Sequence, residues 1–240
     1  MDFNLENKSK DNETKNNSKN KNKNKNLGNN VVCATPSNDT RNHYQAMISE
    51  VFKDSKNDKL MIMGVGNDLK GDDGFGVELV RFLRRYYVRK LHLQDEIINE
   101  DIDKYENEAE NETDYIEVFK IKDNLVLLDS GVVPENFTDL IKAEKPSKIV
   151  IVDAALMHKE FGTIDLIDEN QLATVGFSTH ALPLSVLIKY VKSNIDTDIS
   201  IVGFEPYSLE FGNTLSKEAG CILQEFSKEF ALKIDEFLKF

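Results

Sequence analysis

Three polar residues that lie far apart in the chain have side chains able to bind a metal ion or move a proton: Asp73, Asp153 and His180. Each follows an apolar run or lies in the loop before a predicted helix, where a side chain is available to a ligand. Two carboxylates and one imidazole suit a borderline divalent metal with open coordination positions. The same three groups would also serve as an acid–base site, and the residues alone leave both chemistries open.

Each of the three residues also has an ordinary structural explanation. Asp73 could cap the helix that follows it, and Asp153 could accept hydrogen bonds from loop amides. His180 could be a loop histidine with satisfied ring nitrogens, because a single histidine carries little information. The functional interpretation therefore depends on whether the fold brings the three together.

The stretch from residue 60 to residue 91 shows how the first of these residues is positioned. An apolar run at 60–65 ends in a Gly-x-Gly turn, and the adjacent carboxylates Asp72 and Asp73 follow before a helical apolar pattern begins. Glycine allows the backbone conformations that such a turn requires. The positive end of the next helix favours ionised carboxylates. The stretch therefore predicts a strand, a loop that carries two carboxylates, and a helix.

The remainder of the folded part alternates between apolar strands and amphipathic helices. We expect strands at 60–65, 124–128, 148–152, 163–167 and 199–204, and helices at 74–91, 134–142, 183–192 and 215–238. This alternation predicts an α/β fold of three layers, with a twisted, mostly parallel five-stranded sheet and helices on both of its faces. Ligands bind such sheets beyond the carboxyl ends of the strands. That rule places Asp73, Asp153 and His180 at one edge.

Two segments do not fit this pattern. Residues 1–30 contain eleven Asn and seven Lys, and such a composition cannot bury enough apolar surface to fold. We therefore expect residues 1–45 to be a disordered extension, with a short helix starting near His43. Residues 94–117 contain eleven acidic residues and one basic residue, which indicates a surface insert. The domain itself is expected to span residues 58–240.

Composition excludes several classes of function. The formal net charge of −12 argues against general nucleic-acid binding, which needs a basic surface. No run approaches the ~18 apolar residues of a membrane span, and no secretory signal is present, so we expect a cytoplasmic protein. Two dissimilar cysteines argue against a cysteine metal site. Leu69 stands where a dinucleotide-binding motif needs its third glycine, so no organic cofactor is expected.

Three motifs, in order along the chain, resemble those of the NiFe-hydrogenase maturation endopeptidases. G-V-G-N-D-L-K-G-D-D-G-F-G at 64–76 is similar to the opening motif of that family, and I-V-I-V-D-A at 149–154 and S-T-H-A-L-P-L at 178–184 follow. P-E-N at 134–136 and the T-H-x-x-P-L pattern resemble the branch that processes formate-hydrogenlyase-type (group 4) and coenzyme F420-reducing hydrogenases. Ser130 departs from the family, because a glycine is typical at that position.

The resemblance implies an endopeptidase that removes the C-terminal extension of a NiFe-hydrogenase large-subunit precursor after nickel insertion. It assigns the catalytic and metal-contacting positions to Asp73, Asp153 and His180, with the nickel carried by the substrate rather than owned by the protease. The expected partner is that precursor, and the chain is expected to act as a monomer, although no sequence pattern bears on oligomeric state.

Two other functions remain open at this level. A non-catalytic nickel-binding assembly module could use the same fold and the same three side chains. An ordinary metal-dependent hydrolase would keep a metal of its own. No Ser-His-Asp or Cys-His combination indicates a covalent nucleophile.

Overall fold

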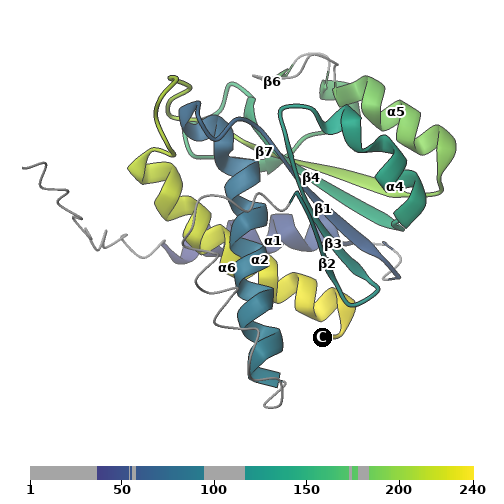
Figure 1. The fold of residues 1–240 in the computed structure, drawn as a ribbon. Coiled ribbons are helices and arrows are strands. Elements are labelled where there is room, and N and C mark those ends of the chain that lie inside the picture. Colours follow the sequence, from purple (N-terminus) through teal and green to yellow (C-terminus); the bar gives the residue numbers. More distant parts are fainter. Residues whose placement is uncertain (1–36, 54, 56–57, 95–116, 173–174, 178–183) are drawn as a thin grey trace, which may run out of the picture. The chain divides into compact units, whose positions relative to one another are not determined.

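The computed structural model describes residues 37–240 except 54, 56–57, 95–116, 173–174 and 178–183. Its centre is a mixed sheet with the strand order β2-β3-β1-β4-β7-β5, and β6 pairs with β4 beside this order (Figure 1). The strands are β1 (Leu60–Val65), β2 (Val118–Ile121), β3 (Leu125–Gly131), β4 (Lys148–Leu156), β5 (Ile164–Leu166), β6 (Gly176–Phe177) and β7 (Asp198–Phe204). The four central strands, β3, β1, β4 and β7, are parallel. The outer strands β2 and β5 are antiparallel to their neighbours.

Helices cover both faces of this sheet. The longer ones are α1 (Asn38–Val51), α2 (Phe75–Gln94), α4 (Thr138–Glu144), α5 (Leu184–Asn194) and α6 (Lys217–Leu238), and the 3-10 turns are η1 (Gly71–Gly74), η2 (Pro134–Phe137) and η3 (Glu169–Gln171). Helices α1, α2 and α6 share one apolar core with one face of the sheet, whereas α4 and α5 share a second core with the other face (Figure 1). None of the described helices has the length and apolar character needed to cross a membrane.

Successive side chains along each central strand point to opposite faces of the sheet and so belong to different cores. On β1, Leu60 and Ile62 belong to the core under α2 and α6, and Met61 and Met63 belong to the core under α4 and α5. Every residue of β1 is buried, as expected for a parallel strand that is covered on both faces. This division decides the face on which any polar side chain near a strand end lies.

The predicted three-layer α/β class is confirmed, but the predicted strand count of five is too low. Strands β2 and β6 were not predicted, because four and two residues are too short to show an alternating pattern. Strand β2 also begins directly after the acidic insert, most of which lies outside the described residues. The predicted edge strand at 163–167 is confirmed as β5.

The predicted extension boundary at residue 45 is wrong, because α1 begins at Asn38. Ser37 caps the helix, since its side chain accepts a hydrogen bond from the amide of Thr40 at 3.1 Å, and this satisfies an otherwise unpaired donor. Tyr44 is buried and its ring lies edge-on to Phe226 of α6. Helix α1 is therefore part of the domain core.

Helix α2 lies directly on the sheet at Gly76. A Cβ atom at this position would overlap the carbonyl oxygens of Val152 on β4 and Val65 on β1. Gly64 on β1 shows the reverse contact, because a Cβ there would overlap the carbonyl oxygen of Gly76. Two glycines of the Gly64–Gly76 motif thus allow the start of α2 to contact two strand ends without an intervening side chain.

We expect Gly76→Ala to lower the free energy of unfolding by about 1–3 kcal/mol or more, because overpacking would move α2 away from β1 and β4. Gly220→Ala is the matched control. Gly220 lies in α6, where nothing occupies the space of an added Cβ within 4 Å. That change should raise stability by about 0.5–1 kcal/mol. Urea unfolding followed by circular dichroism measures both, and equal stabilities of the two variants would contradict this packing argument.

Candidate active site

All five buried carboxylates among the described residues lie at one edge of the sheet, at or just beyond the carboxyl ends of the parallel strands. They are Asp72 and Asp73 after β1, Asp129 on β3, Asp153 on β4 and Glu205 after β7. Burying a carboxylate is costly unless other groups compensate for the lost water. Such a concentration of buried acids at the ligand-binding edge of an α/β sheet identifies this edge as the candidate active site.

The structure places Asp73 and Asp153 on neighbouring segments, and neither side chain is exposed to solvent. The turn η1, which carries Asp73, packs against β4. The oxygen Oδ2 of Asp73 accepts a hydrogen bond from the amide of Asn67 at 3.0 Å. Gly66 makes this turn possible, because its φ is +135° and a Cβ there would overlap the carbonyl oxygen of Asp73.

Alternation along β4 puts Asp153 on the face that α4 and α5 cover, since Ile149 and Ile151 belong to that core. Helix α5 begins at Leu184, shortly after His180 in the sequence. His180 itself lies outside the described residues, so the structure places only Asp73 and Asp153 of the three predicted residues, on segments that pack against each other. Among the described residues, no group of three His, Cys, Asp or Glu side chains could hold a metal ion.

Asp72, the neighbour of Asp73, connects the loop after β1 to the loop after β7 by hydrogen bonds. Its carboxylate accepts hydrogen bonds from the amides of Tyr207 (2.9 Å), Ser208 (3.1 Å) and Ser216 (2.6 Å), and from the hydroxyl of Ser216 (3.0 Å). Ser216 in turn caps α6, because its Oγ accepts a hydrogen bond from the amide of Ala219. The two adjacent aspartates therefore differ in their partners: Asp72 joins three segments of the chain, whereas Asp73 accepts a hydrogen bond from Asn67 within its own turn.

Asp129 is a buried acid of this edge that was not among the predicted site residues. Its oxygen Oδ2 lies 3.2 Å from Nε of Arg81 on α2, and Arg81 also pairs with Asp68 at 2.9 Å and with Glu78 at 2.7 Å. Burial raises the pKa of Asp129, and the nearby Arg81 opposes that shift. The rule that selected Asp153 would also have selected Asp129, because it stands at the end of the apolar run 124–128.

Ser130, the departure from the family pattern, is accommodated by a bulge. Gly64 pairs with Asp129 and Val65 pairs with Gly131, so Ser130 is the extra residue between two pairs. Its hydroxyl donates a hydrogen bond to the carbonyl oxygen of Gly64 at 2.9 Å. The serine thus ties the end of β3 to the end of β1 at the point where the glycine turn begins.

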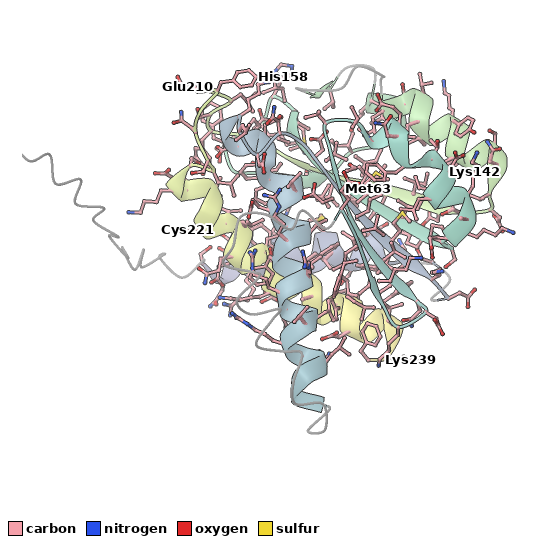
Figure 2. All side chains as sticks on the ribbon, in the orientation of Figure 1. Met63, Lys142, His158, Glu210, Cys221 and Lys239 are labelled. Atoms are coloured by element: carbon pink, nitrogen blue, oxygen red, sulfur yellow. The ribbon has the colours of Figure 1, made fainter. Side chains whose placement is uncertain are left out.

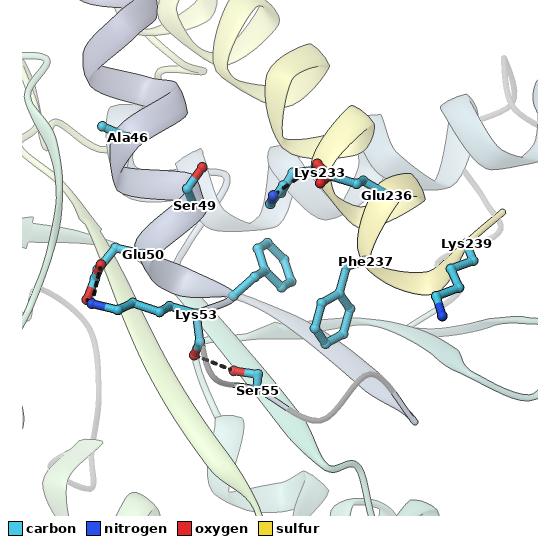
Figure 3. A pocket seen from close by; sticks show the side chains of 10 residues that line it. Ala46, Ser49, Glu50, Lys53, Ser55, Lys233, Glu236, Phe237 and Lys239 are labelled. Atoms are coloured by element: carbon cyan, nitrogen blue, oxygen red, sulfur yellow. Dashed lines mark hydrogen bonds and ion pairs between the residues drawn. The ribbon is translucent and has the colours of Figure 1, made fainter.

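A separate cavity of about 630 Å³ lies between the ends of α1 and α6, and Phe52 and Phe237 are among its lining residues (Figure 3). Two lining lysines pair with nearby glutamates: Lys53, just after α1, pairs with Glu50, and Lys233 pairs with Glu236 of α6. None of the residues that line it is a predicted site residue. The cavity is therefore not part of the candidate active site.

We expect Asp72→Asn to destabilise the fold by about 2–4 kcal/mol, because an amide group would turn N–H atoms toward backbone donors. Hydrogen exchange should accelerate in residues 205–216, and a thermal melt should show the loss of stability. Glu210→Gln, an exposed change in the same loop, is the control and should alter neither. Normal protection of residues 205–216 in Asp72→Asn would contradict the assigned role.

The raised pKa of Asp129 predicts a pH-dependent effect of Asp129→Asn. The Asp129 carboxyl binds a proton more tightly in the folded protein than in the unfolded chain. The stabilisation that this proton gives the fold is therefore complete below pH 3.8 and is lost as the pH rises through the folded pKa. The variant lacks that loss, and its stability relative to wild type should increase as pH rises above 3.8. Urea unfolding over a pH series measures the difference.

Asp139→Asn is the control for this series. Lys142 lowers the pKa of the exposed Asp139 carboxyl, so stability from this group is present above pH 3.8 and is lost as pH falls. The relative stability of this variant should stay level or decrease as pH rises. The same trend in both variants would show that burial of Asp129 is not the cause.

Comparison with known sequences identifies a family to which this chain is similar. The sequence model of a family described as hydrogenase maturation protease matches residues 114–230. A chain of Methanocaldococcus jannaschii that is assigned to the hydrogenase maturation proteases is 39% identical over 165 residues, which cover 69% of this chain and 81% of that one. The hydrogenase 3 maturation protease of Escherichia coli K12 is 35% identical over 86 residues, which cover 35% of this chain and 54% of that one.

A solved structure is similar in fold. The crystal structure of a NiFe-hydrogenase maturation protease from Thermococcus kodakarensis KOD1 matches with a TM-score of 0.56 and 27% sequence identity, over 80% of this chain and 99% of that one. The alignment with the Methanocaldococcus relative covers 81% of the length of that relative. The sequence and fold comparisons agree with each other, and the chain belongs to the hydrogenase maturation protease family.

Proposed function

We propose that this protease removes the C-terminal extension of a NiFe-hydrogenase large-subunit precursor after nickel has been inserted. The observation that carries the proposal is the pair of fully buried carboxylates, Asp73 and Asp153, on adjoining segments at the carboxyl edge of the sheet. Family membership supplies the reaction class, and both acids lie at the edge of the sheet where α/β proteins of this kind bind their ligands.

Asp73, Asp153 and His180 are proposed to contact the nickel ion that the precursor carries. Oxygen and imidazole ligands suit a borderline divalent metal. The two described carboxylates come from different strand ends, so they can approach such an ion from different sides. The nickel belongs to the substrate in this proposal, and the three side chains would report whether the precursor has been loaded.

Two chemical routes are compatible with this arrangement. In the first, the metal polarises the scissile carbonyl group or an attacking water, as a Lewis acid does. In the second, one carboxylate removes a proton from water as a general base, and the metal serves as a checkpoint. The division between Asp72 and Asp73 bears on both routes, because only Asp73 is proposed to act in the chemistry.

The test is a mass-spectrometric cleavage assay with purified precursor, nickel-loaded or nickel-free, and full-length protease. Wild type should release a C-terminal peptide from the loaded precursor only. Asp73→Asn, Asp153→Asn and His180→Gln should each lower the cleavage rate by a factor of about 100 or more, with unchanged circular dichroism. Gln45→Ala, an exposed change on α1, should cleave normally.

Each alternative outcome has a defined meaning. Cleavage of nickel-free precursor would show that the three residues act as an ordinary protease site or bind their own metal. Binding of the precursor without any change in its length would favour a nickel-binding assembly module. Normal cleavage by His180→Gln would remove His180 from the site.

A further inference from the structure

Large apolar side chains are exposed around the same edge of the sheet. Leu69 is 68% exposed, Phe161 65%, Phe211 74% and Tyr207 38%. They come from the loops that follow β1, β4 and β7, the strands that also carry or precede four of the buried acids. Single exposed apolar residues are common on proteins, but a group of them on converging loops needs an explanation.

These four residues, here called the apolar rim, belong to segments that are joined to one another. The amide of Gly212 donates to the carbonyl oxygen of Leu69 at 2.8 Å, which places the backbone of Phe211 beside that of Leu69. The rings of Phe161 and Tyr207 have centroids 5.9 Å apart. Figure 2 shows His158 and Glu210, which lie in two of these loops, at the same end of the domain.

The rim is held in place from beneath by buried acids. Asp72 accepts hydrogen bonds from the amides of Tyr207 and Ser208. Glu205 accepts hydrogen bonds from the amides of Met157 and Lys159 at 2.7 and 3.2 Å, in the loop that leads to Phe161. Loops that are already ordered pay little entropy when a partner binds. Such preorganisation suits a docking surface.

Exposed apolar residues are also concentrated at this edge rather than spread over the described surface. Six of the nine large ones lie here, with Val133 after β3 and Leu156 at the end of β4 in addition to the rim. The other three lie on helices: Val186 and Tyr190 on α5 and Leu232 on α6. The six therefore lie at or beyond the carboxyl ends of the central strands.

We propose that the apolar rim docks the folded body of the hydrogenase precursor through an apolar patch on that protein, beside the site that receives its C-terminal segment. This inference rests on the proposed function. Leu69 lies four residues before Asp73, and Tyr207 is bonded to Asp72 next to it, so the rim is continuous with the candidate site.

The four residues of the rim are uncharged, so a contact made through their side chains is apolar rather than ionic. Lys70, with its Nζ 5.8 Å from the centroid of the Phe211 ring, is a cation that borders the rim. Contact between apolar surfaces does not depend on charge complementarity. Docking through the rim should therefore respond weakly to ionic strength.

The test compares full-length wild type with the double variant Leu69→Ser/Phe211→Ser. Leu232→Ser on α6, 59% exposed in the folded protein, is the matched control. Steady-state cleavage of nickel-loaded precursor should show a KM about tenfold or more higher in the double variant, with kcat within about twofold, because docking area is lost and the chemistry is not. Leu232→Ser should leave KM unchanged. Circular dichroism should show that all three proteins are folded.

The outcomes separate this inference from the proposed function. If wild type cleaves and the double variant has the wild-type KM, the rim does not dock the precursor and the proposed function stands. If wild type does not cleave, the proposed function fails, and calorimetric binding of the same precursor tests the rim: equal affinities overturn it, and at least about tenfold weaker binding by the double variant supports it.

Two further results would overturn the inference. A KM that rises steeply with ionic strength in wild type would assign docking to charged groups instead of the rim. The second such result would come from sedimentation analysis of wild type and the double variant. A wild-type dimer that the double variant dissociates would show that a second copy of this chain, and not the precursor, occupies the rim.

Discussion

The buried carboxylate of Asp72 is the constraint on which the rest of the functional edge depends. A carboxylate without solvent access is tolerated only when hydrogen-bond donors replace the lost water, and here four donors do so from Tyr207, Ser208 and Ser216. Those residues follow it by more than 130 positions. One charged group therefore decides where the loop after β7 lies relative to the loop after β1, and so where Asp73 is held.

The sheet order gives these acids a common location. Parallel strands end at the same edge, and the order β3-β1-β4-β7 places their ends side by side. Asp72 and Glu205 use their oxygens to bind loop amides, and Asp129 pairs with Arg81. Scaffold and candidate chemistry are built from the same residue type at the same edge, which explains why a count of acids in the sequence cannot separate the two.

Prediction from the sequence was most accurate where a local pattern decides the structure. Residues 60–65 were predicted as a strand and form β1, because an apolar run that ends in glycines has few alternatives. The location of Asp73 and Asp153 followed from the rule for strand ends. The role of Asp72 and the pairing of Asp129 with Arg81 depend on contacts between distant segments, and nothing in the neighbouring sequence of Asp72 or Asp129 reveals them.

The two outer strands have a consequence for assembly. Strands β2 and β5 have four and three residues, and each carries a charged residue at its middle or beside it, Lys120 and Asp165. Short, charged border strands offer a poor template for a further strand from another polypeptide, so they oppose edge-to-edge aggregation. The sheet is thereby protected against growth by strand addition at its sides.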